Sequence, residues 1–115
     1  MSGNRLAAIP REITKLPLLT AVYLSRNFIR EVGSDVGRML GLEKLDLMMN
    51  RISRISTAVT RLGDLIELDL SANELDDISV LSGLRKLHLL SARYNYITTV
   101  REGGGAQPRW LIVVG

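Results

Sequence analysis

Apolar positions along the chain form a block that recurs at a nearly constant interval. In residues 65–75, "LIELDLSANEL", leucines stand first, fourth, sixth and last, and an asparagine stands ninth. The same pattern fills residues 19–29 and 42–52, and it fills 87–97 with Ala92 at the third apolar position. Alternation of apolar and polar residues around the two central leucines has the period of two that is typical of a β-strand. We therefore expect one short strand in each block.

Between the blocks, apolar residues are spaced by three or four positions. After Asn50 they are Ile52, Ile55, Val59, Leu62 and Leu65. This spacing favours a short α-helical or 3₁₀ segment with one apolar face. The interval after Asn73 has 22 residues rather than 23 and steps evenly by three, so we expect a tighter, more 3₁₀-like segment there.

All five asparagines of the chain occupy the same position of this repeat, at separations of 23, 23, 23 and 22 residues. They are Asn4, Asn27, Asn50, Asn73 and Asn95. A chain that coils in this way turns sharply after each strand and leaves backbone N–H and C=O groups inside, where they must be paired. An asparagine side chain offers both a donor and an acceptor. We therefore predict a structural asparagine ladder between coils; none of the five lies in an N-x-Ser/Thr glycosylation motif.

The block resembles the leucine-rich repeat, L-x-x-L-x-L-x-x-N-x-L, over about residues 4–100. The resemblance implies an α/β solenoid: a horseshoe arc with parallel concave strands and short helical or 3₁₀ convex segments. Residues 4–24, "NRLAAIPREITKLPLLTAVYL", are similar to the 23-residue intracellular class called the Ras-group or typical type. That class includes signalling scaffolds and the repeat region of fungal adenylate cyclases. The interval after Asn73 is more similar to the 22-residue type of a phosphatase regulatory subunit.

The chain divides into a repeat region, residues 1–100, and an irregular C-terminal tail, residues 101–115. The repeat region holds a partial first repeat and about four more. Solenoids normally need capping repeats at their ends, and none is recognisable, so we expect a piece of a larger protein. The apolar end of the tail, "WLIVV", is either an improvised capping strand or a foreign or truncated end without an evolved role.

Composition excludes several classes of function. The chain has 115 residues, no cysteine and one histidine, which excludes disulfides and thiolate metal sites and favours a reducing, cytoplasmic setting. The 15 Lys and Arg residues exceed the 12 Asp and Glu residues only slightly and do not cluster, so nucleic acid is not indicated as a partner. No apolar run approaches the roughly 20 residues of a membrane span, so no membrane partner is expected.

Candidate catalytic groups do not form a site in the sequence. His88 stands at the start of a predicted strand and is interpreted as a surface residue. Asp76 and Asp77 are interpreted as part of a solvated turn, because no D-x-D-x-D-G series follows them. The segment "GGGAQPR" lacks the spacing of a phosphate-binding loop. We expect no enzyme activity, no cofactor, no metal and no small-molecule substrate.

The variable strand positions remain as the candidate site. Stacked parallel strands lie about 4.8 Å apart, so equivalent residues form columns on the concave face. The columns place an acidic centre, Asp46, Glu67 and Asp69, beside basic and apolar side chains. Tyrosine, methionine and arginine are enriched at protein interfaces. The predicted protein-binding residues are Tyr23, Arg26, Lys44, Asp46, Met48, Glu67, Asp69, Arg93 and Tyr94.

These observations predict an interaction module that binds a folded protein partner, as a signalling scaffold or regulatory segment. The Ras-group resemblance implies a small GTPase as that partner. Two alternatives stay open: the repeat region of a larger signalling enzyme such as a fungal-type adenylate cyclase, and a fragment without independent function. Under the binding hypothesis, Asp69→Arg is expected to weaken partner capture without lowering stability.

Overall fold

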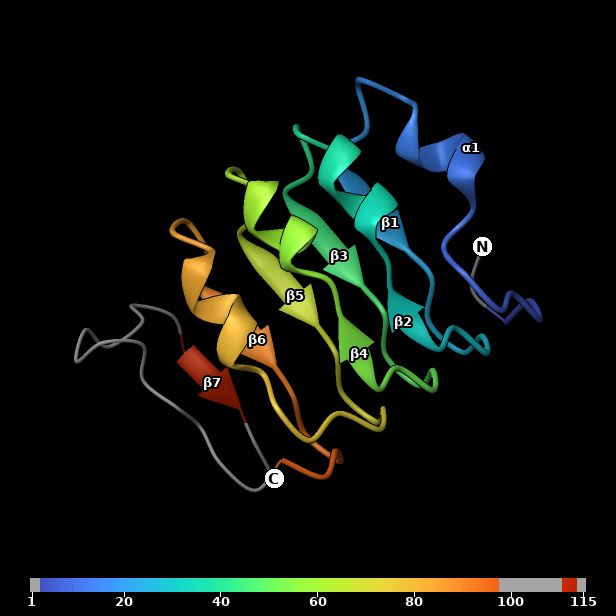
Figure 1. Cartoon of the computed structure of the whole chain (residues 1–115), viewed down its shortest axis with the longest axis vertical. Helices are drawn as coiled ribbons and strands as arrows, with labels where there is room; N and C mark the ends of the chain where they lie inside the picture. The colour runs from blue at the N-terminus through green and yellow to red at the C-terminus, as the bar shows by residue number, and fades with distance from the viewer. Residues whose placement is uncertain (1–2, 98–110, 114–115) are drawn as a thin grey trace.

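The computed structural model describes residues 3–97 and the backbone of residues 111–113, and Figure 1 shows them as a stack of similar coils. Strands form a single parallel layer on one side of the stack, and short helical segments form a second layer on the other. The strands are, in order across the sheet, β1 (Ala21–Tyr23), β3 (Lys44–Asp46), β5 (Glu67–Asp69), β6 (Leu89–Ser91) and β7 (Leu111–Val113). The chain is an α/β leucine-rich-repeat solenoid, as the repeat predicts.

Neighbouring strands pair in the register of the repeat. Val22 lies opposite Leu45, Leu45 opposite Leu68, and Leu68 opposite Leu90. These central residues are buried, whereas the residues on either side of them are half-buried or exposed. One side chain of each of β1, β3, β5 and β6 therefore enters the core, and the two beside it face the concave surface.

Within residues 3–97, the opposite layer consists of one α-helical turn and three 3₁₀ helices. They are α1 (Arg11–Thr14), η1 (Ser34–Arg38), η2 (Thr57–Arg61) and η3 (Ser79–Gly83). The convex segment of the shorter coil after Asn73 is a 3₁₀ helix, as expected, but it is no tighter than the others. The segments η1, η2 and η3 all have five residues and the same type. The reason is a three-residue apolar step in every coil, closed by a backbone hydrogen bond such as Leu62 N to Val59 O at 3.0 Å.

A second, two-stranded parallel sheet was not anticipated from the sequence. It pairs β2 (Glu31–Val32) with β4 (Arg54–Ile55), which lie between the turn after the asparagine and the 3₁₀ helix. This pairing adds backbone hydrogen bonds between two coils on the side away from the main sheet. The two sheets together hold these coils at one spacing.

The core lies between the two layers and is aliphatic. Leu65, Leu68 and Leu70 of one coil are almost completely buried, and their equivalents Leu42, Leu45 and Leu47 in the coil before are buried as well. Burying a leucine contributes about 1.5–3 kcal/mol. Because much of this surface is covered by neighbouring coils, the stability of each coil depends on the next.

The C-terminal tail contributes a strand to the main sheet. β7 pairs in parallel with β6, and Ile112 lies opposite Leu90. Of the two interpretations of "WLIVV", the capping strand fits this pairing. The rest of the tail, and the predicted boundary at residue 100, lie outside the described residues.

Candidate functional site: the concave face of the sheet

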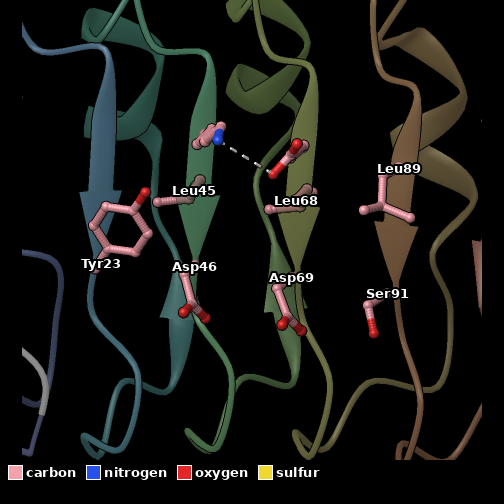
Figure 2. A pocket seen from close by; sticks show the side chains of 9 residues that line it. Tyr23, Leu45, Asp46, Leu68, Asp69, Leu89 and Ser91 are labelled. Carbon is pink, nitrogen blue, oxygen red and sulfur yellow. Dashed lines mark ion pairs between the residues drawn. The ribbon is translucent and has the colours of Figure 1, made fainter.

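Side chains from four neighbouring strands border a shallow hollow on the concave face (Figure 2). The lining residues are Tyr23, Lys44, Leu45, Asp46, Glu67, Leu68, Asp69, Leu89 and Ser91. Its volume is about 190 Å³. Pockets for drug-sized ligands typically have about 300–1,000 Å³. The hollow therefore suits a side chain projecting from a macromolecule better than an enclosed small molecule.

The hollow brings together part of the predicted site. Its predicted members are Tyr23, Lys44, Asp46, Glu67 and Asp69. Leu89 and Ser91, which were not among the predicted site residues, line the hollow as well, together with the buried Leu45 and Leu68. The remaining predicted residues do not line the hollow and follow the ends of the strands: Arg26, Met48, Arg93 and Tyr94.

An ion pair crosses the hollow between β3 and β5. Lys44 Nζ lies 3.9 Å from Glu67 Oε2, as the dashed line in Figure 2 marks. Both side chains are about half exposed, at 52% and 46%, so the pair contributes little to stability. The pair mainly changes the distribution of charge on the face. The positive charge of Lys44 offsets the negative charge of Glu67, so Asp46 and Asp69 carry the remaining negative charge.

Asp46 and Asp69 also hold the turns that follow their own strands. Asp46 Oδ1 accepts a hydrogen bond from the Met48 N–H at 3.0 Å, and Asp69 Oδ1 accepts one from the Ser71 N–H at 2.9 Å. The Ser71 hydroxyl donates to the same Asp69 oxygen. Each carboxylate has a second oxygen that takes no part in these turn hydrogen bonds.

The double use of Asp69 corrects one sequence-based expectation. Asp69→Arg removes the acceptor that holds the turn as well as the charge. We therefore expect this substitution to lower stability, contrary to the expectation that it affects binding alone. Glu67, whose interaction is the exposed ion pair, is the better residue for testing binding.

The predicted asparagine positions lie behind the concave face, in the turns after the strands. Asn27, Asn50 and Asn73 are buried, Asn95 is half-buried, and Asn4 is exposed. In the last four coils Oδ1 accepts a backbone N–H from the preceding coil. These donors are Leu6, Ile29, Ile52 and Leu75, at 3.1, 3.1, 2.9 and 3.0 Å.

The amide nitrogens extend the same hydrogen-bond network. Asn73 Nδ2 donates to Leu70 O in its own coil at 3.0 Å and to Leu47 O in the preceding coil at 2.9 Å. Asn50 and Asn95 make the equivalent pairs of bonds. Each of these side chains therefore ties its coil to the one before it, which is a structural role.

The residue before each of the last four asparagines has a left-handed backbone, although none of these four residues is glycine. Arg26, Met49, Ala72 and Tyr94 have φ of 58°, 58°, 56° and 59°. Such angles are uncommon for side chains other than Asn, Asp and Gly. The turn places the side chains of Arg26 and Tyr94 on the surface at the ends of the strands.

Other candidate groups lie on the surface and apart from one another. His88 is exposed directly before β6, with its Nδ1 2.6 Å from Lys86 O, and both Asp76 and Asp77 are exposed. Within residues 3–97, no three His, Asp or Glu side chains are placed to share a metal ion. No helix in the described part of the chain is long and apolar enough to cross a bilayer.

A family model described as leucine rich repeat matches residues 40–97, half of the chain. The chain belongs to the leucine-rich repeat family. Domains of this family are generally protein–protein interaction modules. Among curated protein sequences, none matches this leucine-rich repeat chain.

Two solved leucine-rich repeat structures are similar to this chain. A leucine-rich repeat protein of Leptospira interrogans is 28% identical with a TM-score of 0.78, and the match covers 83% of this chain and 24% of that one. The leucine-rich repeat ectodomain of the receptor kinase SOBIR1 from Arabidopsis thaliana is 30% identical with a TM-score of 0.79. That match covers 100% of this chain and 67% of the ectodomain. The chain thus spans about a quarter of the Leptospira protein.

Proposed function

We propose that this leucine-rich repeat chain binds a folded protein through its concave face. The observation that carries the proposal is the row formed by Tyr23, Asp46 and Asp69 on three adjacent strands (Figure 2). The row places an exposed aromatic ring beside two carboxylates that each keep one oxygen outside the turn hydrogen bonds. Aromatic anchors beside charged groups are typical of protein interfaces.

For the partner, we propose a small GTPase, with the chain acting as a cytoplasmic signalling scaffold without catalytic activity. The Ras-group resemblance of residues 4–24 supports the partner, and the absence of cysteine supports a reducing compartment. The negative row on the concave face calls for a basic patch on that partner. Nucleic acid, membrane lipid and small molecules are not part of the proposal.

Binding kinetics with matched charge variants test the proposal. Purified small GTPases in both nucleotide states are passed over the immobilised chain, and Glu67→Lys is compared with Glu12→Lys. Both substitutions replace Glu with Lys and therefore change the net charge equally. Glu12 is exposed on α1, away from the concave face. We expect Glu67→Lys to weaken binding about tenfold or more and Glu12→Lys to leave it unchanged. Equal affinities for the two variants would show that the concave face is not the interface.

A second proposal is that the chain is the repeat region of a larger signalling enzyme. It is supported by the similarity to the leucine-rich repeat ectodomain of a receptor kinase. The complete transcript tests it: an open reading frame that continues into a kinase or cyclase domain would support this proposal. Localisation of the tagged full-length protein tests the compartment, because an ectodomain-like role requires exposure outside the cell.

A further inference from the structure

A second exposed column lies beyond the concave face, at the residues that directly follow the asparagines. Its members are Arg5, Phe28, Arg51, Glu74 and Tyr96. Backbone hydrogen bonds from Phe28, Arg51, Glu74 and Tyr96 to equivalent carbonyls of the preceding coils keep these residues in register, side by side. Phe28 is 42% and Tyr96 is 68% exposed, so aromatic area is presented to solvent along this edge of the solenoid.

Arg26 and Arg30, two residues before and after Phe28, are exposed, as is Arg51 in the next coil; we call Arg26, Phe28, Arg30 and Arg51 the arginine edge. The guanidinium carbon of Arg51 lies 4.9 Å from the centroid of the Phe28 ring, in cation–π geometry. The N–H donors of a guanidinium lie in its plane, and this contact with the ring does not use them as hydrogen-bond donors to an oxygen, so they can meet an acceptor. The ring thus holds a charged group in place for a ligand.

The arginines of this edge have no carboxylate partner within the described residues. The ion pairs found there involve Arg11, Arg38, Lys44 and Lys86 as cations. Arg30 and Arg51 border one hollow of about 250 Å³, together with Ser53 and Glu74. The column therefore changes sign along the solenoid. Arg5 and Arg51 are positive in the earlier coils, and Glu74 is negative in the coil that follows Arg51.

We propose that the arginine edge binds an acidic segment of a protein partner. Carboxylates of the segment would meet the guanidiniums of Arg30 and Arg51, which match a carboxylate in paired hydrogen bonds, and an apolar neighbour would pack on Phe28. The concave face carries Asp46, Glu67 and Asp69, so the same segment is repelled there and attracted here. This site shares only Arg26 with the residues predicted for the concave interface, and one partner can use both.

Fluorescence polarisation with a labelled peptide of alternating Glu and Leu tests this proposal, with a Gln-for-Glu peptide as the probe control. We expect Arg51→Glu to weaken binding of the acidic peptide about tenfold or more. Glu74→Gln is expected to strengthen it, because it removes the carboxylate from the same hollow. Arg85→Glu is the matched control, because Arg85 is exposed in the turn before β6, at the start of the strand rather than its end. We expect binding by Arg85→Glu to stay within about twofold of the parent.

Several outcomes would overturn the proposal. Equal weakening by Arg85→Glu and Arg51→Glu would mean that net charge alone attracts the peptide, and equal binding of the Gln peptide would mean that carboxylates are not recognised. Tighter, Arg51-dependent binding of single-stranded RNA or of phosphatidylserine vesicles would assign the edge to that ligand instead. Circular dichroism checks folding, and Arg30→Glu replaces any Arg51 variant that does not fold. Glu67→Lys should leave peptide binding intact or strengthen it, which separates this site from the concave face.

Discussion

Asn50 and Asn73 share one hydrogen-bond acceptor, the carbonyl oxygen of Leu47. This oxygen lies 3.0 Å from Asn50 Nδ2 and 2.9 Å from Asn73 Nδ2. Leu47 and Asn50 belong to one coil and Asn73 to the next. A single backbone oxygen therefore receives both the bond that closes its own turn and the bond that joins the next coil to it.

Removing one amide should weaken the stack measurably. Asn73→Ala leaves the Ile52 N–H and the carbonyls of Leu47 and Leu70 without this partner, so we expect a loss of about 1–3 kcal/mol in the free energy of unfolding. Urea denaturation followed by circular dichroism measures it. Asn4→Ala, at the exposed member of the series, should cost less than Asn73→Ala, because water can satisfy exposed polar groups. Equal losses at both positions would contradict the ladder.

Charge and turn stability can be separated at Asp69. Asp69→Ala should lower stability by about 1–2 kcal/mol, because Ser71 loses an acceptor for its N–H and its hydroxyl. Asp69→Asn keeps an oxygen at the same place and should recover most of this loss while removing the charge. Thermal unfolding of the two variants measures the difference. If Asp69→Asn is as unstable as Asp69→Ala, the hydrogen bond to Ser71 is not what stabilises the turn.

The left-handed turn predicts opposite effects for the same substitution at two alanines. Ala72 has φ of 56°, where a Cβ costs about 1–2 kcal/mol, so Ala72→Gly should be neutral or stabilising by up to about 1 kcal/mol. Ala58 lies in η2, and Ala58→Gly should be destabilising by about 0.5–1 kcal/mol. Ala72→Val should be the least stable of the three. Denaturation midpoints in the reverse order would refute the turn geometry.

Close packing between η2 and η3 predicts a clash that a second substitution relieves. A Cβ on Gly83 would lie 2.8 Å from Thr60 Cγ2, so Gly83→Ala should cost about 1–3 kcal/mol. Thr60→Ser removes that methyl group and keeps the hydroxyl that donates to Thr57 O, so the double variant should recover part of the loss. Gly63→Ala is the control, because nothing lies within 4 Å of the added atom. Additive losses in the double variant would argue against the contact.

Much of the fold follows from the spacing of apolar residues in the sequence. The constant interval predicts that equivalent strand residues lie side by side, and Ala21, Lys44, Glu67 and Leu89 pair in that register. Solenoids allow this because each coil contacts only its neighbours, so one spacing fixes every pairing. The sheet formed by β2 and β4 could not be predicted from the sequence. Strands of two residues are too short to show an alternation of apolar and polar positions.

The candidate site was predicted less completely, for two physical reasons. The sequence does not show where a side chain points, so the hydrogen bonds from Met48 and Ser71 to the preceding aspartates could not be inferred. The concave columns run through the strands, and Phe28 and Arg51 lie outside these strand positions. A signal for them was present, because the position after each asparagine carries charged or aromatic residues in every coil.

The side chains of the last four asparagines each accept a hydrogen bond from the preceding coil, and this arrangement allows coils to be added to the solenoid. Each of the last four asparagines fastens its own coil to the one before, and three of the four spacings are 23 residues. A duplicate of residues 51–73 inserted after Asn73 would contain its own asparagine, its own strand and its own convex segment. Longer concave faces can therefore be engineered by adding coils, with one new junction to design: in the copy, Arg61 would stand where Gly83 now packs closely against Thr60.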